Sequence, residues 1–202
     1  MSEISLKEKN DLIIKAARER FAHYGYSKVT MDEIAADVEM GKASLYYYFP
    51  TKEELFKAVI ATEQSEFTDE IETMLQKQIS AGQKLHEYVN QRLKHFQSLV
   101  NLGMLSVHSL LDMKSIFKKS FRDFEIQELM LLQKIIDEGK IKKEFSPHLT
   151  NKVAKVFLHI LQGLRFRALR QIKGRSLDNK EYRHLQEEMK IITEIFIEGI
   201  RN

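Results

Sequence analysis

A short stretch near the N-terminus, TMDEIAADVEMGKASLYYYFPTK, restricts the fold more than any other part of the chain. Thr30 and Glu33 have the spacing of a capping box, in which each side chain satisfies an unpaired backbone N–H at the start of a helix. Gly41 is expected to end this helix, because glycine adopts the left-handed conformation that lets a chain leave one helix and soon enter another. A second helix is expected from Ala43 to Phe49. The stretch therefore predicts a helix-turn-helix.

The second of these helices has a composition suited to nucleic acid. It carries no acidic residue, lies between Lys42 and Lys52, and contains three consecutive tyrosines. A tyrosine ring offers an apolar face to sugars and thymine methyl groups and a hydroxyl group to phosphates, so this surface fits a DNA major groove. For Tyr46 a place in the core of the small domain is the alternative. The residues predicted to contact DNA are Thr30, Lys42, Ala43, Ser44, Tyr46, Tyr47, Tyr48 and Lys52.

The same stretch and its flanks carry a pattern of residue types at fixed spacing. The matching residues are Phe21, Gly25, Tyr26, Val29, Thr30, Ile34, Ala35, Val38, Gly41, Ser44, Leu45, Tyr46, Tyr48, Phe49, Lys52, Leu55 and Phe56. This pattern closely resembles the DNA-binding domain of TetR-family transcriptional regulators, over roughly residues 7–60. The resemblance implies a repressor in most cases, with a role as an activator left open. It does not extend over the rest of the chain, where such regulators share a fold but little sequence.

The composition favours an all-α protein. The 202 residues include two prolines, eight glycines and no cysteine, so neither a disulfide framework nor thiolate chemistry is expected. The charged opening MSEISLKEKN argues against a secretory signal, and no run approaches the roughly 18 apolar residues of a membrane span. A soluble, cytoplasmic protein without a membrane partner is therefore expected. Residues 1–52 hold eight basic and eight acidic side chains, which argues against a purely electrostatic DNA binder.

Helical periodicity divides the chain into two domains. Residues 1–52 are expected to form a three-helix DNA-binding domain, and residues 53–202 a helical domain for ligand binding and dimerisation. A linking helix from 53 to about 80 joins them, with Thr51 and Glu54 as its capping box. Further helical patterns cover residues 83–101, 104–113, 116–139 and 151–173, and a last one begins at about residue 179.

The last two helices carry more apolar surface than one packed face needs. The resemblance implies that they pair with their copies across a two-fold axis, and a dimer on a palindromic operator agrees with the short half-site that one helix-turn-helix reads. Gly163 lies in the middle of the first of these helices, where a neighbouring helix can approach closely. The predicted interface residues are Gly163, Leu164, Ile192 and Phe196.

Aromatic, aliphatic and methionine side chains from several helices form a candidate pocket for a small hydrophobic or amphipathic effector. Met and Phe adapt to irregular apolar guests, and bundle helices often enclose such sites, although an ordinary core has the same composition. Arg122, Arg165 or His108 are candidates to meet a polar or acidic head group, with a solvated or paired role as the alternative. The predicted pocket residues are Phe96, Val100, Met104, His108, Met113, Phe117, Phe121, Phe124, Phe157 and Arg165.

Catalytic and metal-binding motifs were searched for as alternatives. The seven histidines show no H-E-x-x-H or other tight ligand spacing, and a single Glu181-x-x-His184 is too little for a di-iron site. There is no G-x-S-x-G and no phosphate-binding glycine loop. His108 and Asp112 share a helical face, which fits a packing role better than catalysis. No enzyme, cofactor or metal is expected, and the remaining alternative is a ligand-binding protein of this fold that has lost operator recognition.

Overall fold

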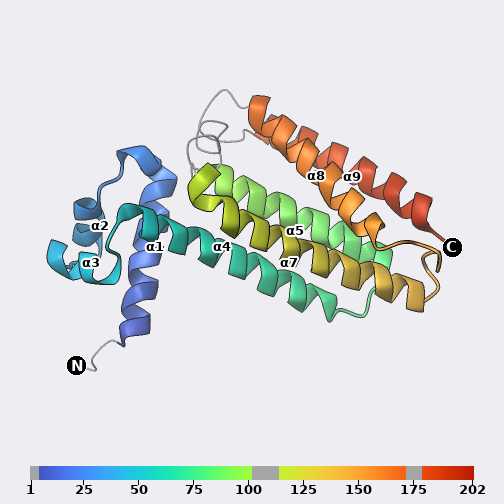
Figure 1. Cartoon of the computed structure of the whole chain (residues 1–202). Helices are drawn as coiled ribbons and strands as arrows, with labels where there is room; N and C mark the ends of the chain where they lie inside the picture. Colours follow the sequence, from blue (N-terminus) through green and yellow to red (C-terminus); the bar gives the residue numbers. More distant parts are fainter. Residues whose placement is uncertain (1–4, 102–113, 172–178) are drawn as a thin grey trace.

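The structure, a computed structural model, describes residues 5–101, 114–171 and 179–202, and of residues 101–120 it describes the backbone of the helical parts alone. These ranges are α-helical apart from a 3-10 turn at Tyr26–Lys28, the connecting turns and one isolated β-bridge. Figure 1 shows a small N-terminal domain at one end of an elongated molecule and a larger helical bundle at the other. The predicted all-α architecture is confirmed.

Three short helices form the small domain together with the first turns of the next helix. They are α1 (Leu6–Tyr24), α2 (Met31–Asp37) and α3 (Lys42–Tyr48). Local capping explains where α1 and α2 begin, because Ser5 with Glu8 and Thr30 with Glu33 form complete capping boxes. Gly25 has a positive φ of 81° and ends α1, as predicted. The buried core of this domain comprises Ile13, Ala17, Phe21, Val29, Met31, Ile34, Ala35, Leu45, Phe49, Leu55, Phe56, Val59, Ile60 and Leu99.

The turn between α2 and α3 differs from the prediction in one respect. Gly41 has an extended backbone with a φ of −64° and is the N-cap of α3. The left-handed residue is Glu39, with a φ of 52°, and Met40 donates its backbone N–H to the carbonyl of Ala35 at 2.9 Å. The assignment of the left-handed position to Gly41 was therefore wrong. The chain turns out of α2 before it reaches Gly41, so Glu39 adopts the positive φ.

Helix α4 (Lys52–Leu75) contributes to both domains, because its first turns lie in the small core and Phe67, Ile71 and Met74 lie in the large one. It ends at Leu75, short of the predicted end at about residue 80. The reason is a capping box that the sequence analysis missed. Ser80 and Gln83 exchange backbone-to-side-chain hydrogen bonds of 3.0 and 3.1 Å and start α5 (Ala81–Asn101) at a new angle.

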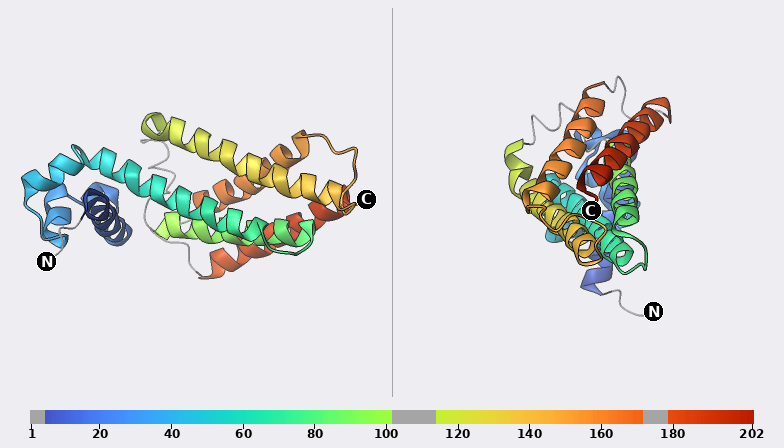
Figure 2. Two further views of the ribbon diagram at one scale, coloured as in Figure 1. Left: turned by 90° about the horizontal axis from the view of Figure 1, so that it is seen from below. Right: turned by 90° about the vertical axis from the view of Figure 1, so that its right-hand side faces the viewer.

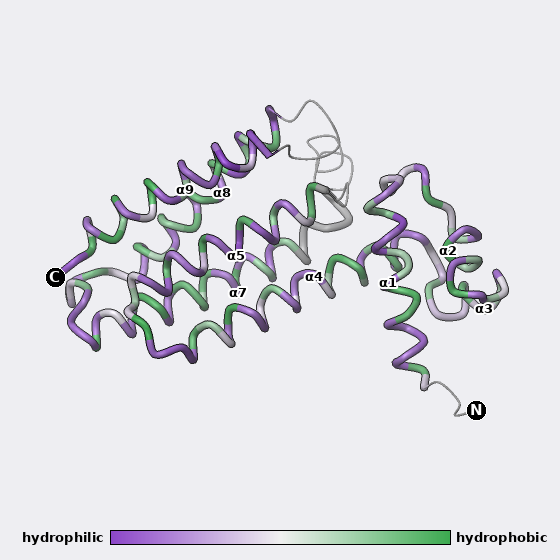
Figure 3. Tube along the Cα trace, turned by 180° about the vertical axis from the view of Figure 1, so that it is seen from behind, coloured by the Kyte–Doolittle hydropathy of each residue, from purple (hydrophilic) through white to green (hydrophobic). Residues whose placement is uncertain are grey.

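The larger domain consists of the rest of α4 with α5, α7 (Lys114–Ile141), α8 (Lys152–Gln171) and α9 (Asn179–Ile200). Helix α5 is central and packs against α4, α7 and α9, while α8 packs against α7 and α9. Figure 2 shows this bundle along and across its long axis. Hydrophobic and hydrophilic residues alternate along each helix in Figure 3, as amphipathic packing requires. None of the helices in the described ranges is both long and apolar enough to cross a lipid bilayer.

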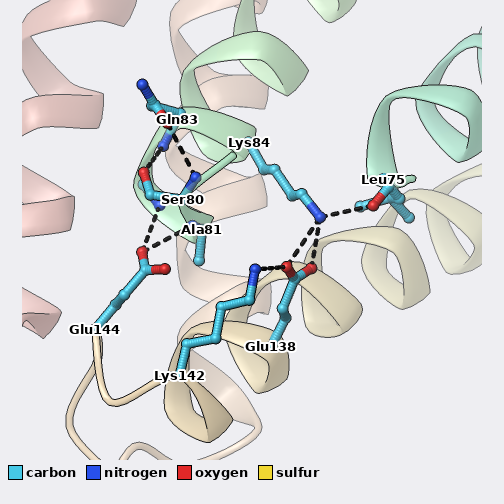
Figure 4. Close-up of polar contacts among 9 residues, drawn as sticks. Leu75, Ser80, Ala81, Gln83, Lys84, Glu138, Lys142 and Glu144 are labelled. Carbon is cyan, nitrogen blue, oxygen red and sulfur yellow. Dashed lines mark hydrogen bonds and ion pairs between the residues drawn. The ribbon is translucent and has the colours of Figure 1, made fainter. Parts of the chain in front are cut away.

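A polar network closes the end of the bundle that lies away from the small domain (Figure 4). The buried ammonium of Lys84 donates to the Leu75 carbonyl at 2.6 Å and to both oxygens of Glu138 at 2.8 and 2.9 Å. Glu144 accepts the backbone N–H of Ala81 at 2.7 Å. These contacts satisfy the last carbonyl of α4 and the first donor of α5, so they fix the sharp change of direction between the two helices.

Gly139 is the tightest glycine position in this end of the bundle. Helix α7 continues past it to Ile141, instead of ending near Gly139 as predicted, and the ring of Phe145 folds back onto it. A Cβ atom at this position would run into the Phe145 ring and would lie 2.9 Å from the Cβ of Ala81. The glycine is therefore required by a close approach of neighbouring side chains.

Gly139→Ala is expected to destabilise the protein by about 1–3 kcal/mol, because overpacking a well-filled site outweighs the better helix propensity of alanine. Gly199→Ala is the matched control, since its added Cβ meets nothing within 4 Å and should leave stability unchanged or slightly higher. Thermal and urea unfolding of the two variants measure the difference. Equal stability of Gly139→Ala and wild type would contradict the packing described here.

Candidate functional site

The outward face of α3 is polar and aromatic. Lys42, Ala43, Ser44, Tyr46 and Tyr47 are exposed, and Tyr47 exposes 78% of its surface. The opposite face carries the fully buried Leu45, which anchors the helix in the small core. Two exposed tyrosines therefore lie beside Lys42 and Ser44 on one face, which combines aromatic and polar side chains. The geometry therefore presents these side chains together to an outside surface.

Tyr48 lies at the edge of this face. It is half-buried and packs against the small core, and its ring meets that of Tyr47 edge-on with 5.5 Å between centroids. Tyr48 thus limits the orientations that the Tyr47 ring can take. Of the three tyrosines, Tyr47 projects farthest from the domain and Tyr48 supports it.

Lys42 is exposed and ion-paired at the start of α3. Its ammonium lies 2.8 Å from a carboxylate oxygen of Asp32 on α2, and the hydrogen bond and charge of Asp32 raise the pKa of Lys42. Exposed pairs of this kind contribute little stability, so Lys42 can exchange Asp32 for another acceptor at a small cost. Thr30 is also exposed, as the N-cap of α2.

Lys52 is more enclosed than the sequence pattern suggested. Its ammonium donates to the backbone carbonyls of Tyr26 and Val29 at 3.0 Å each and lies 4.4 Å from the centre of the Tyr26 ring. Burial lowers the pKa of Lys52. The side chain therefore ties the first turn of α4 to the loop that leads into α2, and it positions the helix-turn-helix in the unbound protein.

Two ionic contacts hold α1 in place. The guanidinium of Arg20 binds both carboxylate oxygens of Asp37 on α2, with Nη2 at 2.8 Å from Oδ1, and this hydrogen bonding lowers the pKa of Asp37. Arg18 Nη2 lies 2.5 Å from Oε1 of the buried Glu63 on α4. Ser98 of α5 donates to the other oxygen of Glu63 at 3.4 Å. The small domain is thus connected through Glu63 to both α4 and α5 of the bundle.

The predicted pocket residues fall into three groups. Phe96, Val100, Phe124, Phe157 and Arg165 are all buried within the larger domain. Phe121 is half-buried and packs against the core of the small domain, so it lies at the junction of the two domains. The side chains of Met104, His108, Met113 and Phe117 lie outside the described residues.

A cluster of buried polar side chains surrounds Arg165. We define the charged cluster as Tyr88, Arg92 and His95 of α5, Glu128 of α7 and Arg165 of α8, which are all at most 9% exposed. The sequence analysis missed four of these five. A signal was present, because Tyr88, Arg92 and His95 follow each other at helical spacing on the apolar face of α5, where a charged residue is expected only with a partner.

Glu128 is the acceptor at the centre of the charged cluster. It accepts the Tyr88 hydroxyl at 2.8 Å and Arg92 Nε at 2.5 Å on one oxygen, and Arg92 Nη2 at 3.5 Å on the other. Burial alone would raise the pKa of Glu128, but the charges of Arg92 and Arg165 and the two hydrogen-bond donors outweigh it, so the pKa is lowered. Burial, together with the charge of Arg92, lowers the pKa of Arg165 to about 10. Glu128 and Arg165 are therefore charged at neutral pH.

The four predicted interface residues differ from one another in burial. Gly163 is exposed, and a Cβ added there would meet nothing within 4 Å. Leu164, Ile192 and Phe196 are half-buried against the large core, and Phe196 stacks on Phe157 with ring centroids 4.1 Å apart. The exposed apolar residues of these two helices, which the sequence analysis did not single out as interface residues, are Val156, Ile160, Phe166, Ile191 and Ile195.

Arg167 of α8 and Glu188 of α9 form an ion pair that joins the two helices. Val156, Ile160 and Gly163 repeat at helical spacing on α8, and Glu188, Ile191 and Ile195 do so on α9. Together these residues form one outward surface, which we call the α8–α9 face. Among the described residues, no group of three or more His, Asp or Glu side chains is arranged to hold a metal ion.

Comparisons with known proteins identify the class to which this fold and this helix-turn-helix belong. The family model "Bacterial regulatory proteins, tetR family" matches residues 13–59. A crystal structure of a transcriptional regulator from Cytophaga hutchinsonii is 42% identical, covers 96% of this chain and 99% of its own, and superposes with a TM-score of 0.88. The chain belongs to the TetR family of bacterial transcriptional regulators. The chain is therefore a transcriptional regulator of that family.

Two curated relatives match over shorter stretches. The HTH-type transcriptional regulator YhgD of Bacillus subtilis is 25% identical over 114 residues, 52% of this chain and 60% of that protein. The biofilm operon icaADBC negative transcriptional regulator IcaR of Staphylococcus epidermidis is 43% identical over 47 residues, 23% of this chain and 25% of that protein. The chain thus spans less than two thirds of the length of either relative.

His95 provides a test of the charged cluster through the pH dependence of stability. Burial and the charges of Arg92, Arg165 and Arg18 lower its pKa from 6.5 to about 3. Below about pH 6.5, His95 is protonated in the unfolded chain but stays neutral in the folded chain. The free energy of unfolding therefore falls as pH falls, and His95 contributes about 1.4 kcal/mol of this fall per pH unit. In His95→Gln this contribution is expected to disappear between about pH 6.5 and pH 4.

Urea unfolding at several pH values measures this effect. His184→Gln is the matched control, because the His184 side chain is 64% exposed on α9. The stability of the control should fall with pH as steeply as that of wild type. A pH slope in His95→Gln as steep as in the control would show that His95 is not held neutral by its surroundings.

Proposed function

We propose that the protein is a cytoplasmic, ligand-responsive repressor that binds a palindromic operator as a homodimer. The observation that carries this proposal is the exposed face of α3, with Lys42, Ser44 and Tyr47 held rigidly by Leu45 and displayed away from the bundle. The name of the relative IcaR as a negative regulator supports repression. A dimer bound across an operator also covers the DNA that other proteins would need.

DNA contact is assigned to the side chains that α3 and its flanks expose. Tyr47, Lys42, Ser44 and Ala43 lie toward the groove, and Tyr46 lies beside them. Thr30 lies at the α2 N-terminus, where backbone N–H groups favour a phosphate. Tyr48 and Lys52 act indirectly in the interface. Tyr48 packs against the Tyr47 ring, and Lys52 holds the loop before α2.

The α8–α9 face is the proposed dimer interface. Ile191 and Ile195 expose 56% and 61% of their surface, which is a large apolar exposure for two residues one turn apart. Gly163 leaves room for a second helix to approach. Half-buried Leu164, Ile192 and Phe196 support this surface from behind by packing on the core. A symmetric dimer would place two copies of α3 for two half-sites of a palindrome.

The effector is proposed to be small and hydrophobic or amphipathic and to bind inside the larger domain near Phe96, Phe124, Phe157 and Arg165. The Arg18–Glu63–Ser98 contacts give a physical route to the DNA-binding domain, because a shift of α5 or α4 moves a partner of α1. A ligand that binds better to the conformation with badly spaced α3 helices lowers operator affinity by the ratio of its affinities for the two states. The alternative of a binding protein without operator recognition does not account for the exposed Tyr47.

Tyr47→Ala is expected to lower operator affinity by about tenfold or more without changing the melting temperature, because an exposed ring contributes to DNA contact and not to the core. The operator is obtained first by sequencing genomic fragments that the purified protein selects. Gel-shift titration then compares wild type, Tyr47→Ala and a control, Tyr24→Ala, which removes an exposed tyrosine of α1. Unchanged affinity in Tyr47→Ala would remove α3 from the interface.

Gly163→Leu and Ile195→Glu are expected to dissociate the homodimer, the first by blocking close helix approach and the second by burying a charge. Sedimentation velocity measures the oligomeric state. Leu12→Glu, which changes a residue 51% exposed on α1, is the control and should remain dimeric. If both α8–α9 variants stayed dimeric, the interface would have to lie elsewhere on the molecule.

A further inference from the structure

The charged cluster has an imbalance that its own residues do not correct. Arg92 and Arg165 carry two positive charges and Glu128 carries one negative charge, while His95 is neutral. Among the side chains that the structure describes, the cluster therefore keeps one positive charge more than its carboxylate balances. An uncompensated buried charge costs several kcal/mol, which is why buried charges are normally paired.

Three nitrogen atoms in the cluster are buried and unpartnered. They are Nη1 of Arg92, Nη1 of Arg165 and Nε2 of His95, and none of them has a hydrogen-bond partner within the described part of the chain. Both Nη1 atoms are N–H donors, and an imidazole nitrogen donates in one tautomer. Buried donors without partners are rare in folded proteins and call for an explanation. Here they accompany the excess positive charge.

Apolar rings enclose the same place. The guanidinium of Arg92 lies over the rings of Phe67 and Phe124, at 5.5 and 5.4 Å from their centres. The imidazole of His95 packs against the same two rings, at 5.1 and 5.9 Å between centroids. A group that reaches the unpartnered donors would therefore have an apolar portion in contact with aromatic side chains from α4 and α7.

We propose that the charged cluster binds the carboxylate of an amphipathic monocarboxylic acid, with Arg165 as its principal counter-ion. One negative charge balances the cluster, and a guanidinium edge matches the two oxygens of a carboxylate. The apolar chain of the acid lies among the aromatic rings. This inference names the chemical class of the effector, and so it rests on the effector binding proposed above. A dianion such as a phosphate monoester would leave a negative charge uncompensated in the interior.

The cluster is also placed to transmit binding. Arg92 and His95 lie on α5 within two turns of Ser98 and Leu99, which contact Glu63 and the core of the small domain. Glu128 of α7 occupies Nε and Nη2 of Arg92, so a carboxylate on the free Nη1 atoms of Arg92 and Arg165 adds a link between α5 and α8 beside the existing link between α5 and α7. The position of α5 in the bundle then depends on whether the acid is bound.

Calorimetric titration and thermal shift with the full chain, in the absence of DNA, test this proposal. The probes are decanoate, 1-decanol and decyl phosphate, which share one apolar chain and differ in the head group. Decanoate is expected to bind at least about tenfold more tightly than decanol, since a hydrogen bond to a charged group contributes more than a neutral one. Equal binding of decanoate and decanol, or tighter binding of decyl phosphate than of decanoate, would overturn the proposal.

Arg165→Met should lose the preference for decanoate over decanol, and its melting temperature without ligand should not fall, because the variant removes an uncompensated charge. A marked fall would show that Arg165 is already compensated within the protein, against the proposal. Arg165→Lys keeps the positive charge but loses the planar guanidinium. This variant should bind decanoate less tightly than wild type does, and it should still bind decanoate more tightly than it binds decanol. Equal affinities for the two probes in this second variant would also count against it.

Arg183→Met is the matched control, since Arg183 is an exposed arginine of α9 outside the charged cluster. Its preference for decanoate should equal that of wild type. Operator affinity without any carboxylate is the separate measurement for the proposed regulatory function. If the wild-type protein binds its operator but does not prefer decanoate over decanol, the ligand class alone is refuted. If the wild-type protein selects no operator, the proposed regulatory function is refuted.

Discussion

The two domains share helix α4. The rest of the structure depends on how the apolar residues of this helix are divided between the two cores. Helix α4 buries Leu55, Phe56 and Val59 in the small core and Phe67 and Ile71 in the large one. Neither core is complete without it. Because an α-helix of this length does not bend easily without a proline or a bulge, a displacement of α4 in the bundle is passed on to the helix-turn-helix. The position of the helix-turn-helix therefore depends on packing along the whole length of α4.

A second connection reinforces the first. The buried Glu63 on α4 receives Arg18 from α1 and Ser98 from α5, so three helices from both domains meet at one carboxylate. Burial raises the pKa of Glu63 and the nearby charge of Arg18 opposes this, with burial the larger effect. A buried carboxylate that depends on a partner from another domain makes the relative position of the domains matter energetically. This is a suitable place for a regulator to couple ligand and DNA.

The larger domain departs from an ordinary apolar core at the charged cluster. Most of its interior is leucine, isoleucine and phenylalanine, but α5, α7 and α8 bring two arginines and one glutamate together. Polar side chains inside a bundle are retained when they contribute specificity or function, since apolar replacements usually stabilise as well. The unpartnered donors of this cluster favour function.

The sequence by itself determined the features whose causes are local. The Thr30 capping box, the glycine at the end of α1 and the helical periodicity fixed the small domain and the all-α fold, because their hydrogen bonds join residues three or four apart. The exposed tyrosine face of α3 was also predictable, since its spacing places Leu45 opposite Tyr47.

The tertiary structure decided what depends on distant partners. Lys52 is tied to carbonyls 23 and 26 residues away, and Arg92 finds Glu128 at a separation of 36 residues. The exposure of Ile191 and Ile195 also depends on which side of α9 the bundle covers. A local pattern marks a side chain as apolar or charged, but only the packing of helices decides whether a charge is left in water, paired, or buried without a partner, because that depends on what the rest of the chain brings to it.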